Sequence, residues 1–170
     1  AAQTEHDRGP EQRIVHGAQD HFGASVAMGD FNGDGDEDVF IPNWAGGRNS
    51  LFRGNGDGTF TAITSGSVIS EGGNSTAGAW ADYDNDGDID VLAYKFDYYG
   101  TNNGFYYYQN TGSATAPAFG TPVYNPFGLN GALPTTLLSI GRFADMDNDG
   151  DDDYLAMNFY TTGFRYFKNT

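Results

Sequence analysis

The feature that most constrains this chain is a short acidic loop that occurs three times. The copies are "GDFNGDGDEDVF" (Gly29 to Phe40), "ADYDNDGDIDVL" (Ala81 to Leu92) and "ADMDNDGDDDYL" (Ala144 to Leu155), and they hold 16 of the 23 acidic residues. Counted from its first aspartate, each has an acid or amide at positions 1, 3 and 5, Gly at 6, and acids at 7 and 9. Oxygen-bearing side chains at alternate positions of a tight loop converge on one point, and Gly permits the sharp bend. The pattern therefore predicts three sites for a hard cation such as Ca²⁺.

Two other interpretations of the loops are open to test. A calcium-binding EF-hand begins in a similar way, but it requires a bidentate Glu at position 12 and flanking helices. Position 12 is Ile41, Ala93 and Ala156 here, so the EF-hand is excluded. A lone Asp- and Gly-rich loop is also typical of a solvated turn, and "GNGDGTF" at 54–60, with one acid, is expected to be a hairpin turn. Three copies with five acid or amide positions each favour metal binding.

The loops belong to longer repeats that start 52 and 63 residues apart, a period typical of propeller blades. A strand candidate precedes each loop, a second follows it, and a third ends in a turn, as in "SLFRGNGDG", "GFYYYQNTG" and "GFRYFKNT". Fourth strands are expected in "TFTAIT" and "PAFGTPVY". We predict an all-β, propeller-type array of four-stranded antiparallel blades, with about three repeats in this chain. The expected segments are 1–21, 22–70, 71–128 and 129–170, the last without its fourth strand.

With these motifs the chain resembles the FG-GAP or VCBS repeat family, the calcium-loop blades of integrin α-type propellers. The resemblance runs from about Phe22 to the C-terminus and includes "FG…GDFNGDGDEDV", "LFRGNGDGTF" and "YYYQNTGSATAPAFG". It implies about three Ca²⁺ per chain, each bound by the side chains of positions 1, 3, 5 and 9 and the carbonyl of position 7. The implied ligands are Asp30, Asn32, Asp34, Asp36 (carbonyl) and Asp38; Asp82, Asp84, Asp86, Asp88 (carbonyl) and Asp90; and Asp145, Asp147, Asp149, Asp151 (carbonyl) and Asp153.

Three repeats are fewer than a closed propeller of this family usually has. An unclosed array leaves strand edges exposed, so we expect self-association or a protein partner. "QRIVHG" (Gln12 to Gly17) is expected to pair beside the third strand of the last repeat, Gly163 to Asn169, in the same chain or in a neighbouring one.

Composition excludes several classes of function. A net charge of −15 argues against a nucleic-acid partner, and no apolar run approaches the roughly 18 residues needed to span a bilayer. Without cysteine the chain has no disulfide and no thiolate metal site. His6, His16 and His21 have no spacing that suggests a shared site, and no serine has the context of a hydrolase triad, so we predict no catalytic residue and no enzyme. The beginning Ala1-Ala2-Gln3 fits a mature end after signal-peptide cleavage, so secretion is expected.

Two aromatic stretches, Lys95 to Asn110 and Asn158 to Phe167, either fill the space between blades or bind sugar. We favour packing, and a ligand would most readily be found at Asp97, Tyr98, Tyr99, Asn102 and Asn103, in the expected loop between strands. The sequence thus predicts a secreted, calcium-binding β-repeat module for adhesion or extracellular assembly. A lectin-like carbohydrate-binding propeller is the alternative, and an accessory segment of a larger secreted enzyme is less favoured.

Overall fold

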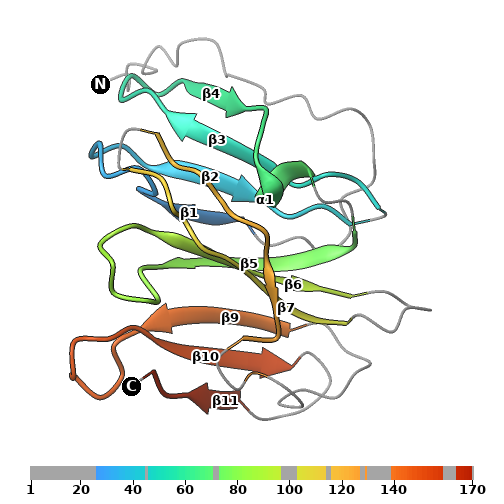
Figure 1. Ribbon diagram of the computed structural model, residues 1–170, viewed down its shortest axis with the longest axis vertical. Helices are drawn as coiled ribbons and strands as arrows, with labels where there is room; N and C mark the ends of the chain where they lie inside the picture. Colours follow the sequence, from blue (N-terminus) through green and yellow to red (C-terminus); the bar gives the residue numbers. More distant parts are fainter. Residues whose placement is uncertain are drawn as a thin grey trace, which may run out of the picture.

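The computed structural model describes three antiparallel sheets and a single helical turn (Figure 1). It describes residues 26–44, 46–70, 73–96, 103–113, 116–126, 129, 139–158 and 164–169. The prediction of an all-β fold is confirmed for these residues, within which the sheets form no closed ring. The N-terminal segment 1–21, with its three histidines and the expected strand Gln12 to Gly17, lies outside them, as do residues 97–102.

Each sheet is built from strands that are consecutive in the chain. The first contains β1 (Ala27–Gly29), β2 (Asp38–Ile41), β3 (Ser50–Gly54) and β4 (Phe60–Ile63); the second contains β5 (Ser75–Ala81), β6 (Asp90–Lys95), β7 (Gly104–Tyr108) and β8 (Val123–Tyr124); the third contains β9 (Ser139–Ala144), β10 (Asp153–Asn158) and β11 (Phe164–Phe167). The acidic loops join the first two strands of every sheet. The helical turn α1 (Ser67–Ser70) buries Val68 and Ile69 and is too short to cross a membrane.

The expected fourth strands formed to different extents. "TFTAIT" contains β4, which pairs with β3 across a hairpin in which the N–H of Asn55 donates to the carbonyl of Thr59 (3.0 Å). The turn at 54–60 is therefore a hairpin, as predicted. "PAFGTPVY" is a strand only at Val123 and Tyr124. Pro117 and Pro122 carry no backbone N–H to donate to a neighbouring strand, which accounts for the shorter element.

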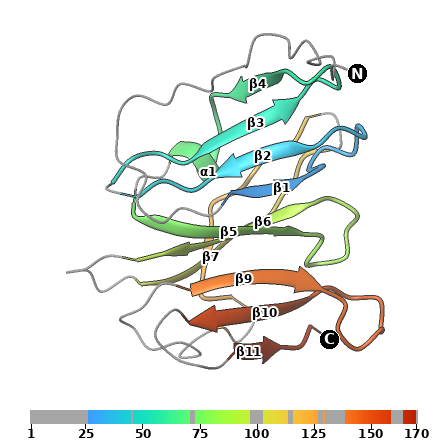
Figure 2. The ribbon, with the colours of Figure 1, turned by 180° about the vertical axis from the view of Figure 1, so that it is seen from behind.

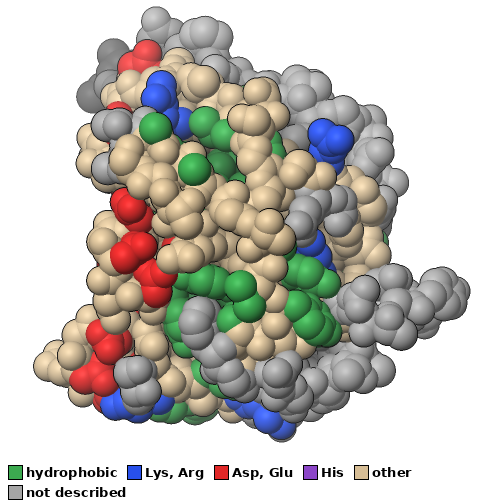
Figure 3. Space-filling view, viewed as in Figure 1, with side chains coloured by type: hydrophobic (Ala, Val, Ile, Leu, Met, Phe, Trp, Pro, Cys, Tyr) green, Lys and Arg blue, Asp and Glu red, His purple; other side chains and the backbone are tan. Residues whose placement is uncertain are grey.

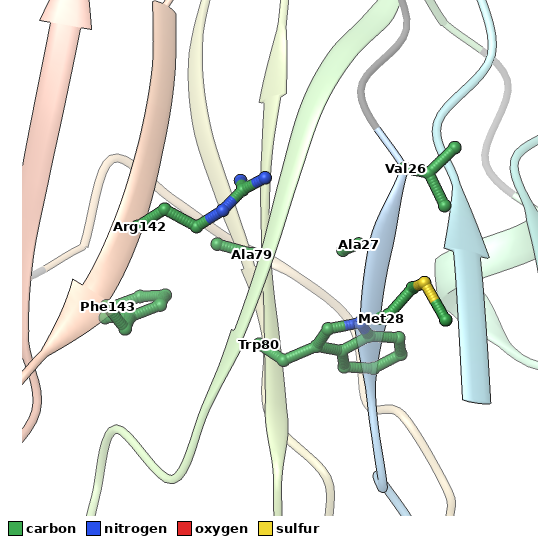
Figure 4. A pocket seen from close by; sticks show the side chains of 7 residues that line it. All are labelled: Val26, Ala27, Met28, Ala79, Trp80, Arg142 and Phe143. Atoms are coloured by element: carbon green, nitrogen blue, oxygen red, sulfur yellow. The ribbon is translucent and has the colours of Figure 1, made fainter. Parts of the chain in front are cut away.

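The three sheets stack in sequence order, with the first and third at opposite ends (Figures 1 and 2). Their inner strands, β1, β5 and β9, lie side by side, and an open hollow of about 460 Å³ lies between them (Figure 4). Side chains of successive residues in a strand point to opposite faces. In β6, Val91 and Ala93 therefore pack toward the first sheet, while Leu92 and Tyr94 pack toward the third. The second sheet is thus covered on both faces.

The aromatic run of β7 follows the same alternation. Tyr106 and Tyr108 belong to the apolar cluster shared with the first sheet, whereas Phe105 and Tyr107 belong to the cluster shared with the third. The interpretation of these aromatic residues as packing between sheets is confirmed for β7.

Candidate metal centre

The three acidic loops share one pattern of hydrogen bonds from backbone to side chain. In the second loop the Asp82 carboxylate accepts bonds from the N–H groups of Asp86 (3.1 Å) and Gly87 (3.0 Å). The Asp86 carboxylate accepts one from the N–H of Asp88 (3.0 Å). The first and third loops form the same three bonds at 2.8–3.2 Å. The repeated sequence pattern therefore specifies one repeated loop conformation.

Two positions of each loop have a left-handed backbone. Position 6 is Gly35, Gly87 and Gly150, with φ of +91°, +93° and +101°, and position 4 is Gly33, Asn85 and Asn148, with φ of +67°, +60° and +61°. Glycine adopts this conformation without steric cost, and asparagine tolerates it better than most residues. The bend at position 6 was predicted. The requirement at position 4 was missed, although the restriction to Gly or Asn was visible in the sequence.

The carboxylates at positions 1, 3 and 5 converge as predicted in the second and third loops. In the second loop, oxygens of Asp82, Asp84 and Asp86 all lie within 4.8 Å of one another. Asp145, Asp147 and Asp149 form the corresponding group in the third loop. Figure 3 shows acidic side chains gathered along the edge of the molecule where the loops lie in Figure 1. Position 3 of the first loop is the buried amide Asn32, whose Oδ1 accepts the N–H of Asp34 (2.9 Å).

The chemistry of this donor set fits a hard divalent cation. It offers carboxylate and amide oxygens without imidazole or thiolate, which is the set that Ca²⁺ prefers. In the second loop, burial raises the pKa of Asp84, and the negative charge of Asp86 raises it further. A cation among these oxygens would relieve that repulsion.

The aspartates at position 9 have a different environment, because they are buried. Asp38, Asp90 and Asp153 are 0%, 1% and 0% exposed. The Asp90 carboxylate accepts the N–H of Tyr83 at position 2 (3.2 Å), the N–H of Asn110 after β7 (2.8 Å) and the hydroxyl of Tyr107 (2.6 Å). We call this residue the clamp aspartate, because it ties the start of the loop to the end of the third strand.

The clamp recurs in the other two sheets. Asp38 accepts the N–H groups of Phe31 (3.0 Å) and Gly54 (2.8 Å). Asp153 accepts the N–H groups of Met146 (3.1 Å) and Asn169 (2.9 Å) and the hydroxyl of Tyr166 (2.8 Å). The metal-ligand role that the resemblance implies for position 9 stays a prediction. The tyrosine hydroxyls were not anticipated from the sequence.

The protonation of the clamp follows from its burial. Burial raises the pKa of Asp90 to about 6, while the hydrogen bonds from Tyr107, Asn110 and Tyr83 act in the opposite direction. Burial also raises the pKa of Tyr107, as does its bond to Asp90. The raised pKa of Tyr107 keeps its hydroxyl protonated, in agreement with the hydrogen bond that it donates to Asp90.

In the third loop, a lysine side chain from another segment lies beside the carboxylates, and the sequence analysis did not predict this contact. The Lys168 ammonium forms ion pairs with Asp147 and with Asp149 (3.0 Å for the latter). It lowers the pKa of Asp149. Lys168 directly precedes Asn169, the clamp partner, and the residue in the same place in the second sheet is Gln109. The neutral amide of Gln109 donates to Asp84 (2.5 Å). The second and third loops therefore differ in charge at an otherwise equivalent point.

Residues 30–93 match the FG-GAP-like repeat. The match begins at position 1 of the first loop and ends in β6, and it confirms the resemblance drawn from the motifs. The third loop lies beyond the matched residues, yet it repeats the hydrogen bonds of the two FG-GAP-like loops. No curated protein matches the chain.

Proposed function

We propose that this chain is a secreted, calcium-binding β-repeat module that works in adhesion or protein assembly. The observation that carries the proposal is the convergence of carboxylates at positions 1, 3 and 5, in loops that share one conformation. When bound, Ca²⁺ would supply the positive charge that these carboxylates lack. The residues that would hold it are the fifteen loop residues named from the resemblance, with the position-9 aspartates also serving as clamps.

The proposed role is structural support of the sheets. Each loop connects two neighbouring strands, and its clamp aspartate holds the third strand of the same sheet. A cation bound in the loop would thereby fix three strands relative to one another. The secreted location is part of the same proposal.

The carbohydrate-binding alternative receives no support from β7, whereas Phe164 and Tyr166 of the second aromatic stretch are 71% and 43% exposed. Phe105, Tyr107 and Tyr108 are at most 5% exposed, so their rings offer no surface to a sugar. Of the loop residues suggested for a ligand, Asp97, Tyr98, Tyr99 and Asn102 lie outside the described residues. The carbonyl of Asn103 accepts the hydroxyl of Tyr124 (2.9 Å).

The test of the proposal is direct calcium titration of Asp86→Ala. The wild-type protein is expected to bind about three Ca²⁺, and the variant about two, because the second loop loses one of its converging carboxylates. Asp57→Ala is the matched control. Its carboxylate lies in the β3–β4 turn, where it accepts the N–H of Thr59 (2.9 Å), so the number of ions should stay unchanged. Equal losses in both variants would indicate that general acidity binds the metal, and a wild-type protein that binds none would refute the proposal.

The Lys168 ammonium beside the third loop predicts that the three loops bind calcium with unequal affinities. Lys168→Gln should raise the calcium affinity of the third loop roughly tenfold, because it removes a positive charge from beside two of the expected ligands. The reciprocal variant Gln109→Lys should lower the affinity of the second loop by a similar factor. Isothermal titration calorimetry of both variants and the wild type measures these changes. Unchanged affinities in both variants would mean that the side chain moves away without cost when calcium binds.

A further inference from the structure

The third sheet exposes a face whose counterpart in the second sheet is buried. In the second sheet, the face toward the third consists of Leu92, Tyr94, Phe105 and Tyr107, which are 2–5% exposed. Leu155 and Met157 have the places of Leu92 and Tyr94, counted from the clamp aspartate. Tyr166 corresponds to Tyr107, because both hydroxyls donate to their clamp, and Phe164 corresponds to Phe105.

This equivalent set is left largely uncovered. Met157, Phe164 and Tyr166 are 55%, 71% and 43% exposed, and Leu155 is partly buried. The first and third sheets are the two ends of the stack (Figures 1 and 2). The uncovered face therefore continues the order of the stack, as the surface on which one more sheet would pack. We call it the terminal face.

The residues that cover the corresponding face of the second sheet show what would fit. From the third sheet these are Phe143, Tyr154, Ala156 and Phe167. The first sheet has apolar residues at the same places relative to its clamp and loop: Met28 is 61% exposed, Ile41 and Phe52 are partly buried, and Val39 is 8% exposed. The first sheet of a second copy therefore has apolar side chains where the third sheet has the apolar side chains that cover the second.

A contact near the inner strands also bears on whether the first sheet of a second copy would fit the terminal face. The residue at position 2 of each loop packs on an aromatic ring of the next sheet: Phe31 stacks on Trp80 at 5.6 Å between ring centroids, and Tyr83 meets Phe143 edge to face at 5.5 Å. The third loop has Met146 at this position, 55% exposed. In the first sheet, the place of Trp80 and Phe143 is taken by Met28, which is 61% exposed. This contact forms between the first and second sheets and again between the second and third. At the two ends of the stack, Met146 and Met28 have the places of its two partners.

We propose that the protein associates head to tail with a second copy of itself, the terminal face of one copy packing on the first sheet of the other. Met146 of one copy would then meet Met28 of its neighbour. Such a contact joins two different surfaces, so it closes into a ring or extends into a filament according to the rotation between copies. The inference deepens the assembly role in the proposed function and rests on it.

The test uses two matched variants, Met157→Asp on the terminal face and Met28→Asp on the first sheet. Both side chains are more than half exposed, so a carboxylate at either place should leave the fold intact, which circular dichroism would verify. By sedimentation velocity in saturating calcium, the wild type should exceed its monomer mass of 18.3 kDa. Each variant alone should be monomeric. Val123→Asp, at an exposed apolar residue of β8 away from both faces, is the control and should behave as wild type.

Mixing the two variants decides the orientation. Each retains one intact face, and the faces are complementary, so the mixture should form a heterodimer of twice the monomer mass. A mixture that stays monomeric overturns the proposal. So does a Met28→Asp protein that assembles as wild type while Met157→Asp does not, because the terminal faces would then pack on each other. A wild type that binds calcium in titration and yet stays monomeric removes this inference and leaves the calcium proposal intact.

Discussion

Removal of calcium with EDTA is expected to lower the melting temperature of the protein by roughly 15–30 °C. A site that binds only the folded state contributes about 2.7 kcal/mol when free calcium is a hundred times its dissociation constant, so three sites contribute about 8 kcal/mol. The total stability of a domain is about 5–15 kcal/mol. For a chain of this length, a loss of 1 kcal/mol lowers the melting temperature by about 2–4 °C. The third site should contribute least, because Lys168 already neutralises part of its charge.

Scanning calorimetry with EDTA, and again after calcium is restored, would measure this effect. Equal additions of sodium chloride serve as the control for ionic strength, because a general screening of the carboxylates would also alter stability. An unchanged melting temperature in EDTA, together with the absence of metal in elemental analysis, would contradict the prediction.

Asp90→Ala is expected to reduce the free energy of unfolding by about 3–5 kcal/mol, with or without calcium. The substitution leaves the N–H groups of Tyr83 and Asn110 and the hydroxyl of Tyr107 without their acceptor, and each buried donor left unpaired costs about 1–3 kcal/mol. The full sum is not expected, because the variant also avoids burying a carboxylate, whose cost appears in its raised pKa.

Urea denaturation in calcium and in EDTA would measure this loss. Asp86→Ala is the matched comparison, since its carboxylate accepts only the N–H of Asp88 among the described contacts. Asp86→Ala should therefore destabilise the protein strongly in calcium and little in EDTA. If the loss caused by Asp90→Ala vanished in EDTA, position 9 would act chiefly as a metal ligand and the clamp would be secondary.

The acidic loops could be predicted residue by residue because their structure is local. Position 1 accepts hydrogen bonds from positions 5 and 6, so the spacing of acids and glycine within one short segment largely determines the conformation. The alternation of the aromatic residues in β7 likewise follows from the two-residue period of a strand. These features required no knowledge of which distant segments meet.

The features that were missed depend on contacts between segments far apart in the chain. Tyr107 reaches Asp90 only because β7 pairs with β6, and Lys168 reaches Asp147 because β11 returns beside the third loop. Neither contact has a spacing that marks it in the sequence. The shorter β8 had a visible signal in Pro117 and Pro122, which we read as part of a strand although proline lacks the donor that pairing requires.

The alternation in β6 has a consequence for how disturbances spread through the molecule. The main contacts between sheets join neighbours, β1 with β5 and β5 with β9, so energetic coupling passes along the stack one step at a time, as in a linear array of repeats. The side chains of Val91 and Leu92 are adjacent in the chain but belong to different clusters, one on each side of the sheet. A disturbance at the first sheet therefore reaches the third through the second, along β6 and β7, whose side chains alternate between the two clusters, and along β5, which lies beside both β1 and β9. The rigidity of the second sheet therefore sets how strongly the first and third sheets affect each other.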